Sequence, residues 1–249
     1  ELDITRTDEV LHFGDINRPN VIINCAAITD TELCEKNPEL AYRVNALGAR
    51  NLSIVASKVG AKIVQLSTDD VFDGFASHPY SEFDDTNPQT VYGRSKWAGE
   101  NYVKEFTHKH FIIRSSWVYG NGINFVNRVL DAAKKQEPLA VPAGEIGAPT
   151  SAKDLARIIL HLINTNEYGT YHVTCKGSCS RYELAREVLT LSGEDATIQE
   201  ISPDAFEQPA VRPVYAVLDN FILRIIDVYD MPYWRDSLKE YIKERMENS

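Results

Sequence analysis

The sequence predicts an α/β fold, in which a doubly wound parallel sheet is followed by a smaller C-terminal lobe. Short apolar runs at residues 21–27, 62–67 and 111–116 have the length and composition of buried strands. The segments at 38–59 and 89–106, which lie between them, have the length of amphipathic helices. Strands that alternate with such helices are typical of a parallel sheet covered on both faces.

The order of these elements also predicts where a site would lie. The helix of residues 38–59 begins at Pro38 and closes at Gly60, which are the residue types favoured at these two helix ends. In open α/β sheets, ligands bind outside the carboxyl ends of the strands. Ala27, Thr68 and Trp117 follow three predicted strands, so we expect the functional site at that edge.

From about residue 139 the alternation of strands and helices becomes less regular. Helices are expected at 151–164, 180–191 and 234–247, separated by connections that contain Pro and Gly. We therefore predict a nucleotide-binding domain at residues 1–138 and a mainly substrate-binding lobe at residues 139–249. Some segments of this lobe, such as 151–164, are expected to pack back on the sheet.

The N-terminal segment departs from a complete dinucleotide-binding fold. Such a fold opens with a strand, a Gly-rich turn and a helix, whose backbone N–H groups approach a pyrophosphate. Here residues 1–5 already resemble the end of a second strand, and no Gly-x-x-Gly-x-x-Gly motif occurs in the chain. We expect the first βα unit and a strand to be absent, a segment of about 30–40 residues.

Composition narrows the class of partner. The 249 residues are 43% hydrophobic and 25% charged, as in ordinary globular proteins. A formal net charge of -10 argues against nucleic acid or an anionic membrane as a partner. No apolar run approaches the ~20 residues needed to cross a bilayer. Four cysteines without a disulfide-rich pattern favour reduced thiols and a cytoplasmic location.

The clearest chemical signal joins a strand end to a helix. Tyr92 and Lys96 are four residues apart on a predicted helix, so they share one face of it. There an ammonium can stabilise the phenolate and lower the pKa of the tyrosine. Thr68 lies at the end of a strand, where its hydroxyl can hold the oxygen that Tyr92 protonates. The three residues predict proton transfer that accompanies a hydride transfer.

A metal site is the weaker alternative for another cluster. His172, Cys175 and Cys179 are the residue types of zinc ligands, but their spacing matches no common zinc motif. A strand end followed by a loop of small residues explains them as well. We therefore expect no metal.

Several motifs together identify a family resemblance. The Tyr-x-x-x-Lys element and the Asn-Ala-x-Gly element belong to segments 91–96 and 45–52. Further matching segments are 21–27, 67–69, 71–74, 116–120, 147–150 and 212–219. The chain resembles the dTDP-4-dehydrorhamnose reductases, which are extended short-chain dehydrogenases/reductases with a Rossmann-like fold, over nearly its whole length. The N-terminal Gly-rich segment of that family is lacking.

The resemblance implies a reaction and a role for each matching residue. The reaction is the reduction of the C4 keto group of dTDP-4-dehydro-6-deoxy-L-mannose (dTDP-4-dehydrorhamnose) to dTDP-L-rhamnose, with Tyr92, Lys96 and Thr68 as the catalytic residues. The nucleotide-sugar substrate is expected to contact Thr68, Asp69 and Trp117. A homodimer is a further expectation. The cofactor, NADPH or NADH, is expected to contact Asp3, Ile4, Ala27, Ile28, Thr29, Leu66, Tyr92 and Lys96.

Three departures from the family pattern fall on the substrate side. Asp70 stands where the family usually has Tyr, and this change adds a charge near the expected sugar. Gly144-Glu145 replaces the usual Asp-Gln, and Arg181 replaces an aromatic residue. These departures bear on the substrate more than on the chemistry.

Two other functions remain open at the level of sequence. Thr68-Asp69-Asp70 approximates the Thr-Asp-Glu of sugar-nucleotide 4,6-dehydratases, so a dehydratase or epimerase is one alternative. The other is a non-catalytic regulatory subunit that keeps the fold without turnover, because fold does not determine function.

Overall fold

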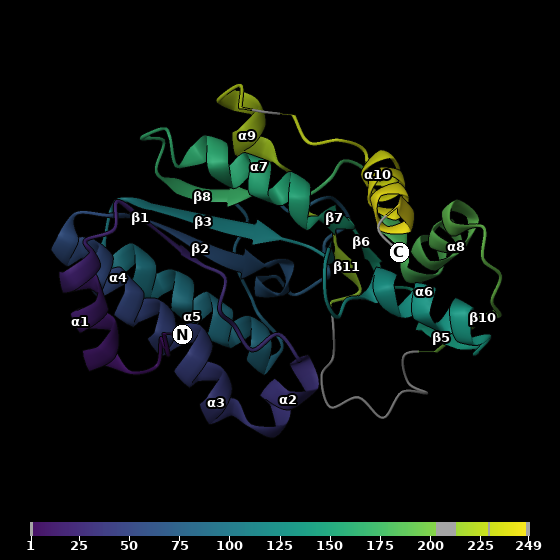
Figure 1. Ribbon diagram of the computed structural model, residues 1–249, viewed down its shortest axis with the longest axis horizontal. Coiled ribbons are helices and arrows are strands. Elements are labelled where there is room, and N and C mark those ends of the chain that lie inside the picture. The colour runs from purple at the N-terminus through teal and green to yellow at the C-terminus, as the bar shows by residue number, and fades with distance from the viewer. Residues whose placement is uncertain (1, 203–212, 229, 248–249) are drawn as a thin grey trace.

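A four-stranded parallel sheet forms the centre of the computed structural model, which describes residues 2–202, 213–228 and 230–247. Its strand order is β1-β2-β3-β8, with bounds Val21–Asn24, Lys62–Thr68, His110–Ser115 and Gly169–His172. All three pairings are parallel, so the carboxyl ends of the strands lie at one edge. Helices cover both faces of the sheet (Figure 1). The predicted doubly wound, Rossmann-like α/β fold is confirmed.

On one face of the sheet, one helix precedes β1, a second lies between β1 and β2, and a third lies between β2 and β3. α1 (Thr7–Asn17), α4 (Ala49–Val59) and α5 (Val91–Phe106) lie on this face in Figure 1. The shorter α2 (Thr31–Lys36) and α3 (Pro38–Tyr42) precede a π-helical turn, η1 (Arg43–Gly48). The helix predicted at 38–59 is therefore confirmed in extent, with α3, η1 and α4 in succession. It ends at Gly60, whose φ of 76° is left-handed.

Two strand predictions need correction. Residues 25–27 leave the strand that was expected over 21–27, because the chain turns there into a loop held by Asn45. Residues 2–5 form no strand, since the Asp3 carboxylate accepts hydrogen bonds from the backbone N–H and the hydroxyl of Thr5 and closes a turn. Glu1 lies outside the described residues. In the described part of the chain, β1 and β8 are the two edge strands of the sheet.

The rest of the chain forms short strand pairs and helices around the carboxyl edge. The pairs are β4 (Val118–Tyr119) with β7 (Thr150–Ser151), and β5 (Leu139–Pro142) with β10 (Ile198–Ile201). A third group joins β6 (Ile146–Gly147) to β9 (Cys179–Ser180) and β11 (Tyr215–Ala216). The helices are η2 (Asp69–Val71), α6 (Phe125–Lys135), α7 (Ala152–Leu162), α8 (Arg181–Ser192), α9 (Phe221–Ile225) and α10 (Trp234–Glu247). α7, α8 and α10 confirm the three helices predicted after residue 139.

One apolar core extends from the sheet into the C-terminal part. Phe111 of β3 and Tyr171 of β8 belong to the same buried cluster as Ile158 of α7 and Trp234 of α10. α7 accordingly packs on the face of the sheet opposite α4 and α5 (Figure 1). The division of the chain at residue 139 stays a prediction. Of the predicted 212–219 element, Arg212 lies outside the described residues.

Among the described residues, no helix is long and apolar enough to cross a bilayer.

Candidate active site

The candidate site begins at the carboxyl end of β2. Thr68 is the last residue of the strand, and its hydroxyl donates a hydrogen bond of 2.9 Å to the Asp69 carboxylate. The same oxygen accepts from the backbone N–H of Asp70 at 3.2 Å and so caps the 3-10 turn η2. The strand therefore presents a buried, oriented hydroxyl at the edge where ligands bind in such sheets.

The turn after Thr68 and the start of α5 are locked together. The Asp70 carboxylate accepts a 2.9 Å hydrogen bond from the hydroxyl of Thr90, and Thr90 caps α5 by accepting from the Gly93 N–H at 2.8 Å. Gly93 allows this close approach, because a Cβ there would lie 2.1 Å from the Asp70 carbonyl oxygen. The Asp70 carboxylate, expected near the sugar, thus points to the N-terminus of α5, where a negative charge is favoured.

This contact brings Tyr92 to Thr68. The first turn of α5 holds the phenol beside the Thr68 hydroxyl at the strand end. Burial raises the pKa of Tyr92, the charges of Asp70 and Asp69 raise it further, and the Thr68 hydrogen bond only partly opposes them. The expectation that this pKa is lowered is therefore wrong for this structure. The phenol is held in its protonated form.

Lys96 lies one turn further along α5 and is almost fully buried. Its ammonium donates a 2.6 Å hydrogen bond to the carbonyl oxygen of Leu66, and burial lowers its pKa to about 8 despite the charges of Glu100 and Cys25. An ammonium has three N–H donors. In the described part of the chain, the ammonium of Lys96 has one hydrogen-bond acceptor, the Leu66 carbonyl oxygen. The remaining donors fit a ligand rich in hydroxyl groups, such as a nucleotide ribose.

Asn45, a residue of the π-turn η1, holds the loop that follows β1. Its side-chain amide accepts from the Ile28 N–H at 2.8 Å and donates to the Ile28 carbonyl and to the Ser95 hydroxyl of α5. Asn45 therefore fixes Ala27, Ile28 and Thr29, three predicted cofactor contacts, against the helix that carries Tyr92 and Lys96. A polar side chain inside a helix usually satisfies a neighbouring backbone group, and Asn45 does so here.

Asp3 and Ile4, the predicted cofactor residues near the N-terminus, lie beside η1 and the start of α4. Ile4 packs on Gly48, where a Cβ would meet its side chain at 2.5 Å, and the Ile4 carbonyl accepts from Asn51. Asp3 is exposed in the adjacent turn, and its hydrogen bonds to Thr5 lower the pKa of its carboxyl. The structure places both residues at the junction of η1 and α4, where Ile4 also lines a hollow with residues 24–26 at the carboxyl end of β1.

The predicted substrate residues come together at the ends of β2 and β3. Asp69 accepts a 2.9 Å hydrogen bond from the hydroxyl of Ser116, the residue before Trp117. Burial raises the pKa of Asp69, opposed by its hydrogen bonds from Ser116 and Thr68 and by the charge of Arg181. Trp117 has a left-handed backbone (φ 45°), and its indole packs on Gly147, where a Cβ would come within 2.4 Å.

Comparison with known proteins decides the family. Residues 1–247 match the family described as the RmlD substrate binding domain. The chain belongs to this family. It is 36% identical over 245 residues to the spore coat polysaccharide biosynthesis protein SpsK of Bacillus subtilis, a match that spans 98% of this chain and 86% of SpsK.

Solved structures of RmlD-family proteins have the same fold. A dTDP-4-dehydrorhamnose reductase from Clostridium acetobutylicum superposes with a TM-score of 0.96 at 45% identity, over 98% of this chain and 88% of that one. The corresponding protein from Bacillus anthracis, in complex with NADP, gives a TM-score of 0.95 at 40% identity, over 98% and 87% of the two chains.

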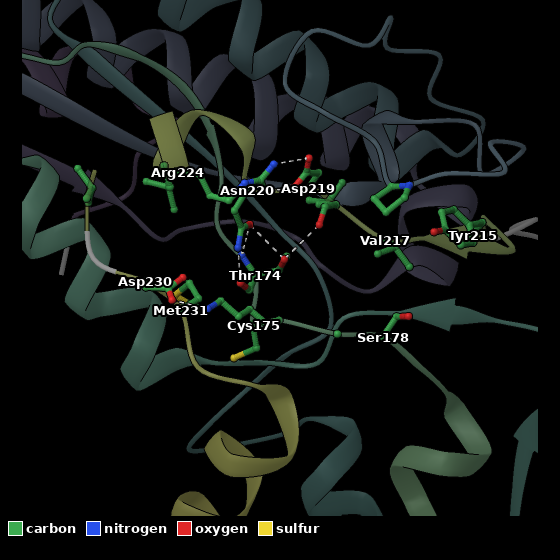
Figure 2. Close-up of a pocket in the computed structure, with 16 residues that line it drawn as sticks. Thr174, Cys175, Ser178, Tyr215, Val217, Asp219, Asn220, Arg224, Asp230 and Met231 are labelled. Atoms are coloured by element: carbon green, nitrogen blue, oxygen red, sulfur yellow. Dashed lines mark hydrogen bonds and ion pairs between the residues drawn. The ribbon is translucent and has the colours of Figure 1, made fainter. Parts of the chain in front are cut away.

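A separate hollow in this RmlD-family chain lies beyond the end of β8 (Figure 2). Its volume is about 290 Å³, and Thr174 and Asn220 are joined inside it by hydrogen bonds of 3.0 and 2.7 Å. Two ion pairs, Lys176–Asp230 and Arg224–Asp219, also lie there, and within each pair the opposite charges compensate one another. None of the predicted site residues lines this cavity.

The geometry does not favour a zinc site at His172. Nδ1 of His172 is 3.0 Å from the Tyr80 carbonyl oxygen, and Nε2 faces the guanidinium of Arg114 at 3.5 Å. The described residues contain no group of three or more His, Cys, Asp or Glu side chains that could hold a metal ion.

Sequence reasoning missed one feature of the RmlD-family site. Glu145 and Arg181 were noted separately as departures from the family pattern, and the structure joins them in an ion pair beside Trp117. The signal in the sequence that could have predicted this ion pair was the opposite charge of the two residues.

Proposed function

We propose that this chain is an NAD(P)H-dependent oxidoreductase that reduces the C4 keto group of dTDP-4-dehydrorhamnose to dTDP-L-rhamnose, in nucleotide-sugar and cell-surface polysaccharide biosynthesis. The observation that carries the proposal is the placement of Tyr92 beside Thr68 at the end of β2, with Lys96 on the next turn of α5. Two dTDP-4-dehydrorhamnose reductases, at 45% and 40% identity, support the substrate.

The cofactor proposal rests on the hydrogen-bond donors of Lys96 at the carboxyl edge of the sheet. The NADP of the Bacillus anthracis relative supports a nicotinamide dinucleotide here. Lys96 would hold the ribose through the donors not used by Leu66, and residues 27–29, fixed by Asn45, would border the middle of the cofactor. When bound, the reduced cofactor supplies the hydride for C4.

The protein's own groups would control the proton and the orientation of the sugar. On substrate binding, the Thr68 hydroxyl would turn its single proton from Asp69 to the C4 oxygen, and Tyr92 would donate its phenolic proton to that oxygen as charge develops there. The ammonium of Lys96 would then stabilise the phenolate that Tyr92 becomes. Asp69 would accept hydrogen bonds from the sugar, and Trp117 would line its pocket.

Dehydration would need Asp70 as a second acid–base group, and its carboxylate is instead bonded to Thr90 beneath the start of α5. This contact supports reduction over the dehydratase alternative. Turnover by the chain would also separate the proposal from a regulatory role.

A cofactor-oxidation assay tests the proposed function. The chain is mixed with NADPH or NADH and with dTDP-4-dehydrorhamnose, and the product is identified by mass and by its sugar configuration. We expect cofactor oxidation and dTDP-L-rhamnose. A matched reaction with dTDP-4-dehydro-6-deoxy-D-glucose tests specificity. Equal turnover of both sugars would contradict the assigned substrate, and no turnover of any 4-keto sugar would contradict the reductase.

We also propose a cytoplasmic location and a homodimer. The four cysteines support the first, since all are free in the structure. The family resemblance supports the second, and light scattering on the purified chain would test it.

A further inference from the structure

An arginine stacks on the tryptophan of the candidate substrate pocket. The guanidinium carbon of Arg181 lies 3.5 Å from the centroid of the Trp117 ring and 5.0 Å from that of Phe125. Nε of Arg181 donates a 3.1 Å hydrogen bond to the Glu145 carboxylate. Both charged side chains are nearly buried, at 13% and 12% exposed. Cation–π and ionic contacts thus act on one guanidinium.

The stability of α8 does not require this arginine. Arg181 is the first residue of the helix, where the helix dipole favours negative charge and disfavours a cation. α8 already has a capping box between Ser180 and Glu183. Burying an ion pair is itself costly in desolvation. The position of Arg181 is therefore better explained by what it faces than by the helix it begins.

Arg181 faces the residues that would touch the sugar. Trp117, on which it stacks, directly follows Ser116, and Ser116 donates to the Asp69 carboxylate at 2.9 Å. Thr68 donates to the other oxygen of that carboxylate. The charge of Arg181 lowers the pKa of Asp69, against the burial that raises it.

We propose that Arg181, held by Glu145 and stacked on Trp117, is a positioning residue that fixes the indole and places a positive charge toward Asp69 for recognition of a sugar hydroxyl. The proposal deepens the proposed reductase function and rests on it for the identity of the sugar. An ionised Asp69 accepts hydrogen bonds only, whereas a protonated one would also donate. Glu145 and Arg181 are departures from the family pattern, so the device belongs to this chain.

Within the described residues, the titratable groups that face Asp69 come from three elements. Tyr92 faces it from α5, Asp70 follows it in η2, and Arg181 faces it from α8. Tyr92 is protonated and Asp70 is bonded to Thr90, so Arg181 supplies the nearby positive charge.

The first test is the pH dependence of substrate use. For Arg181→Gln we expect KM for dTDP-4-dehydrorhamnose to rise about tenfold with kcat within about threefold, since the lost interaction acts on binding. The acid limb of kcat/KM should move upward by about one pH unit, because Asp69 loses a cation. Arg181→Lys keeps the charge but not the planar stack, so it should restore the limb and leave KM raised.

The matched control is Arg235→Gln. Arg235 also lies over a tryptophan, at 4.6 Å from Trp234, and faces Glu187 at 3.6 Å, but it is outside the candidate site. We expect KM and the acid limb to stay those of the parent. An equal change in both variants, or no change in Arg181→Gln, would overturn the proposal.

A second measurement does not depend on the substrate. Carbon NMR of the Asp69 carboxyl, titrated in the parent, in Arg181→Gln and in Arg235→Gln, reports its ionisation directly. We expect the titration midpoint to rise in Arg181→Gln alone, and identical midpoints would overturn the proposal. If the parent lacks reductase activity but the midpoint rises as expected, the proposed function fails and the role of Arg181 stands.

Discussion

The environment of Tyr92 favours a proton donor over a base. Its pKa is raised by burial and by nearby carboxylates, so the phenol carries its proton throughout the neutral range. Reduction of a ketone needs a proton at the new hydroxyl, and the first turn of α5 holds the phenol beside the Thr68 hydroxyl at the strand end. A ligand that draws Lys96 toward Tyr92 would ease the loss of this proton.

Tyr92→Phe should therefore remove catalysis and keep the fold. The change deletes the donor hydroxyl, and general acid catalysis contributes about 10²–10⁴-fold, so we expect kcat to fall by at least about two decades. Cofactor affinity, measured by calorimetry, should change little. Turnover close to that of the parent would exclude Tyr92 as the donor.

Lys96→Met should make the chain more stable and inactive. A buried lysine whose pKa is lowered from 10.5 to about 8 destabilises the folded state where it must be charged, below about pH 8. Between about pH 8 and 10.5 the unfolded chain binds more protons, so this cost fades as pH rises. We expect the variant to gain up to roughly 3 kcal/mol near neutrality, less the lost Leu66 hydrogen bond.

Urea unfolding near neutrality and near pH 10 measures this difference, with exposed Lys239→Met as the control. The gap between Lys96→Met and the parent should narrow at the higher pH, and the control should show no such trend. A parent that is more stable than Lys96→Met at both pH values would contradict the lowered pKa.

At the scale of residues, the spacing along the chain predicted which side chains share a strand end or a helix face. Contacts between residues far apart in the sequence could not be predicted in this way. Thr68, Tyr92 and Lys96 could be predicted because a strand end and a helix face determine their directions. Glu145 and Arg181 are 36 residues apart, and only the packing of α8 beside β6 brings them into contact. The direction of the Tyr92 pKa shift was also missed, since burial cannot be read from spacing.

Among the elements, the junction of η2 and α5 determines the geometry of the site. It depends on Gly93, whose α-carbon packs on the Asp70 carbonyl. A methyl group at this position must push the helix away from the end of β2, and the distance between Tyr92 and Thr68 would grow with it.

Gly93→Ala should therefore lower both stability and activity. The added Cβ would lie 2.1 Å from a backbone oxygen, which cannot move as a side chain can. We expect a loss of about 1–3 kcal/mol in the free energy of unfolding and a fall of about tenfold or more in kcat. Glu105→Ala, at an exposed position of the same helix, is the control and should change neither. Parental kcat in Gly93→Ala would contradict this account.

Hydrophobic periodicity predicted where helices and strands lie, but not their exact boundaries or internal irregularities. The helix over 38–59 was predicted in extent, but its π-turn was not, because the apolar pattern is the same whether or not a π-turn interrupts it. The strand over 21–27 was predicted too long, since an apolar run continues into a loop that Asn45 holds by hydrogen bonds. Residues 2–5 form a turn because the Asp3 side chain competes for backbone N–H groups.

For the whole molecule, the alternation of strands and helices predicted the parallel sheet, and the expectation that residues 151–164 pack back on it is confirmed by α7, but the packing of α10 into the same core was not predicted. Ile158 of α7 and Trp234 of α10 share a cluster with strands β3 and β8, and no local pattern specifies such long-range packing. Buried polar groups add a second link. Arg114 of β3 binds Glu100 of α5 at 2.8 Å and faces His172 of β8.

His172 makes this link sensitive to acid. It is fully buried between the Tyr80 carbonyl and the Arg114 guanidinium, and burial lowers its pKa from 6.5 to about 3. The folded chain therefore keeps His172 neutral while the unfolded chain protonates it below about pH 6.5. Stability from this group is fully present above pH 6.5 and is lost as the pH falls toward 3.

His172→Gln should therefore flatten the acid dependence of stability, whatever it costs at neutral pH. In the parent this histidine should account for roughly 3 kcal/mol of the loss between about pH 6.5 and pH 4. Urea unfolding across that range measures the slope, and His12→Gln, at an exposed position, should leave the slope as in the parent. Since His172 joins β8 to β3 and to the segment before α5, an unchanged slope would mean that this buried contact opens before the molecule unfolds.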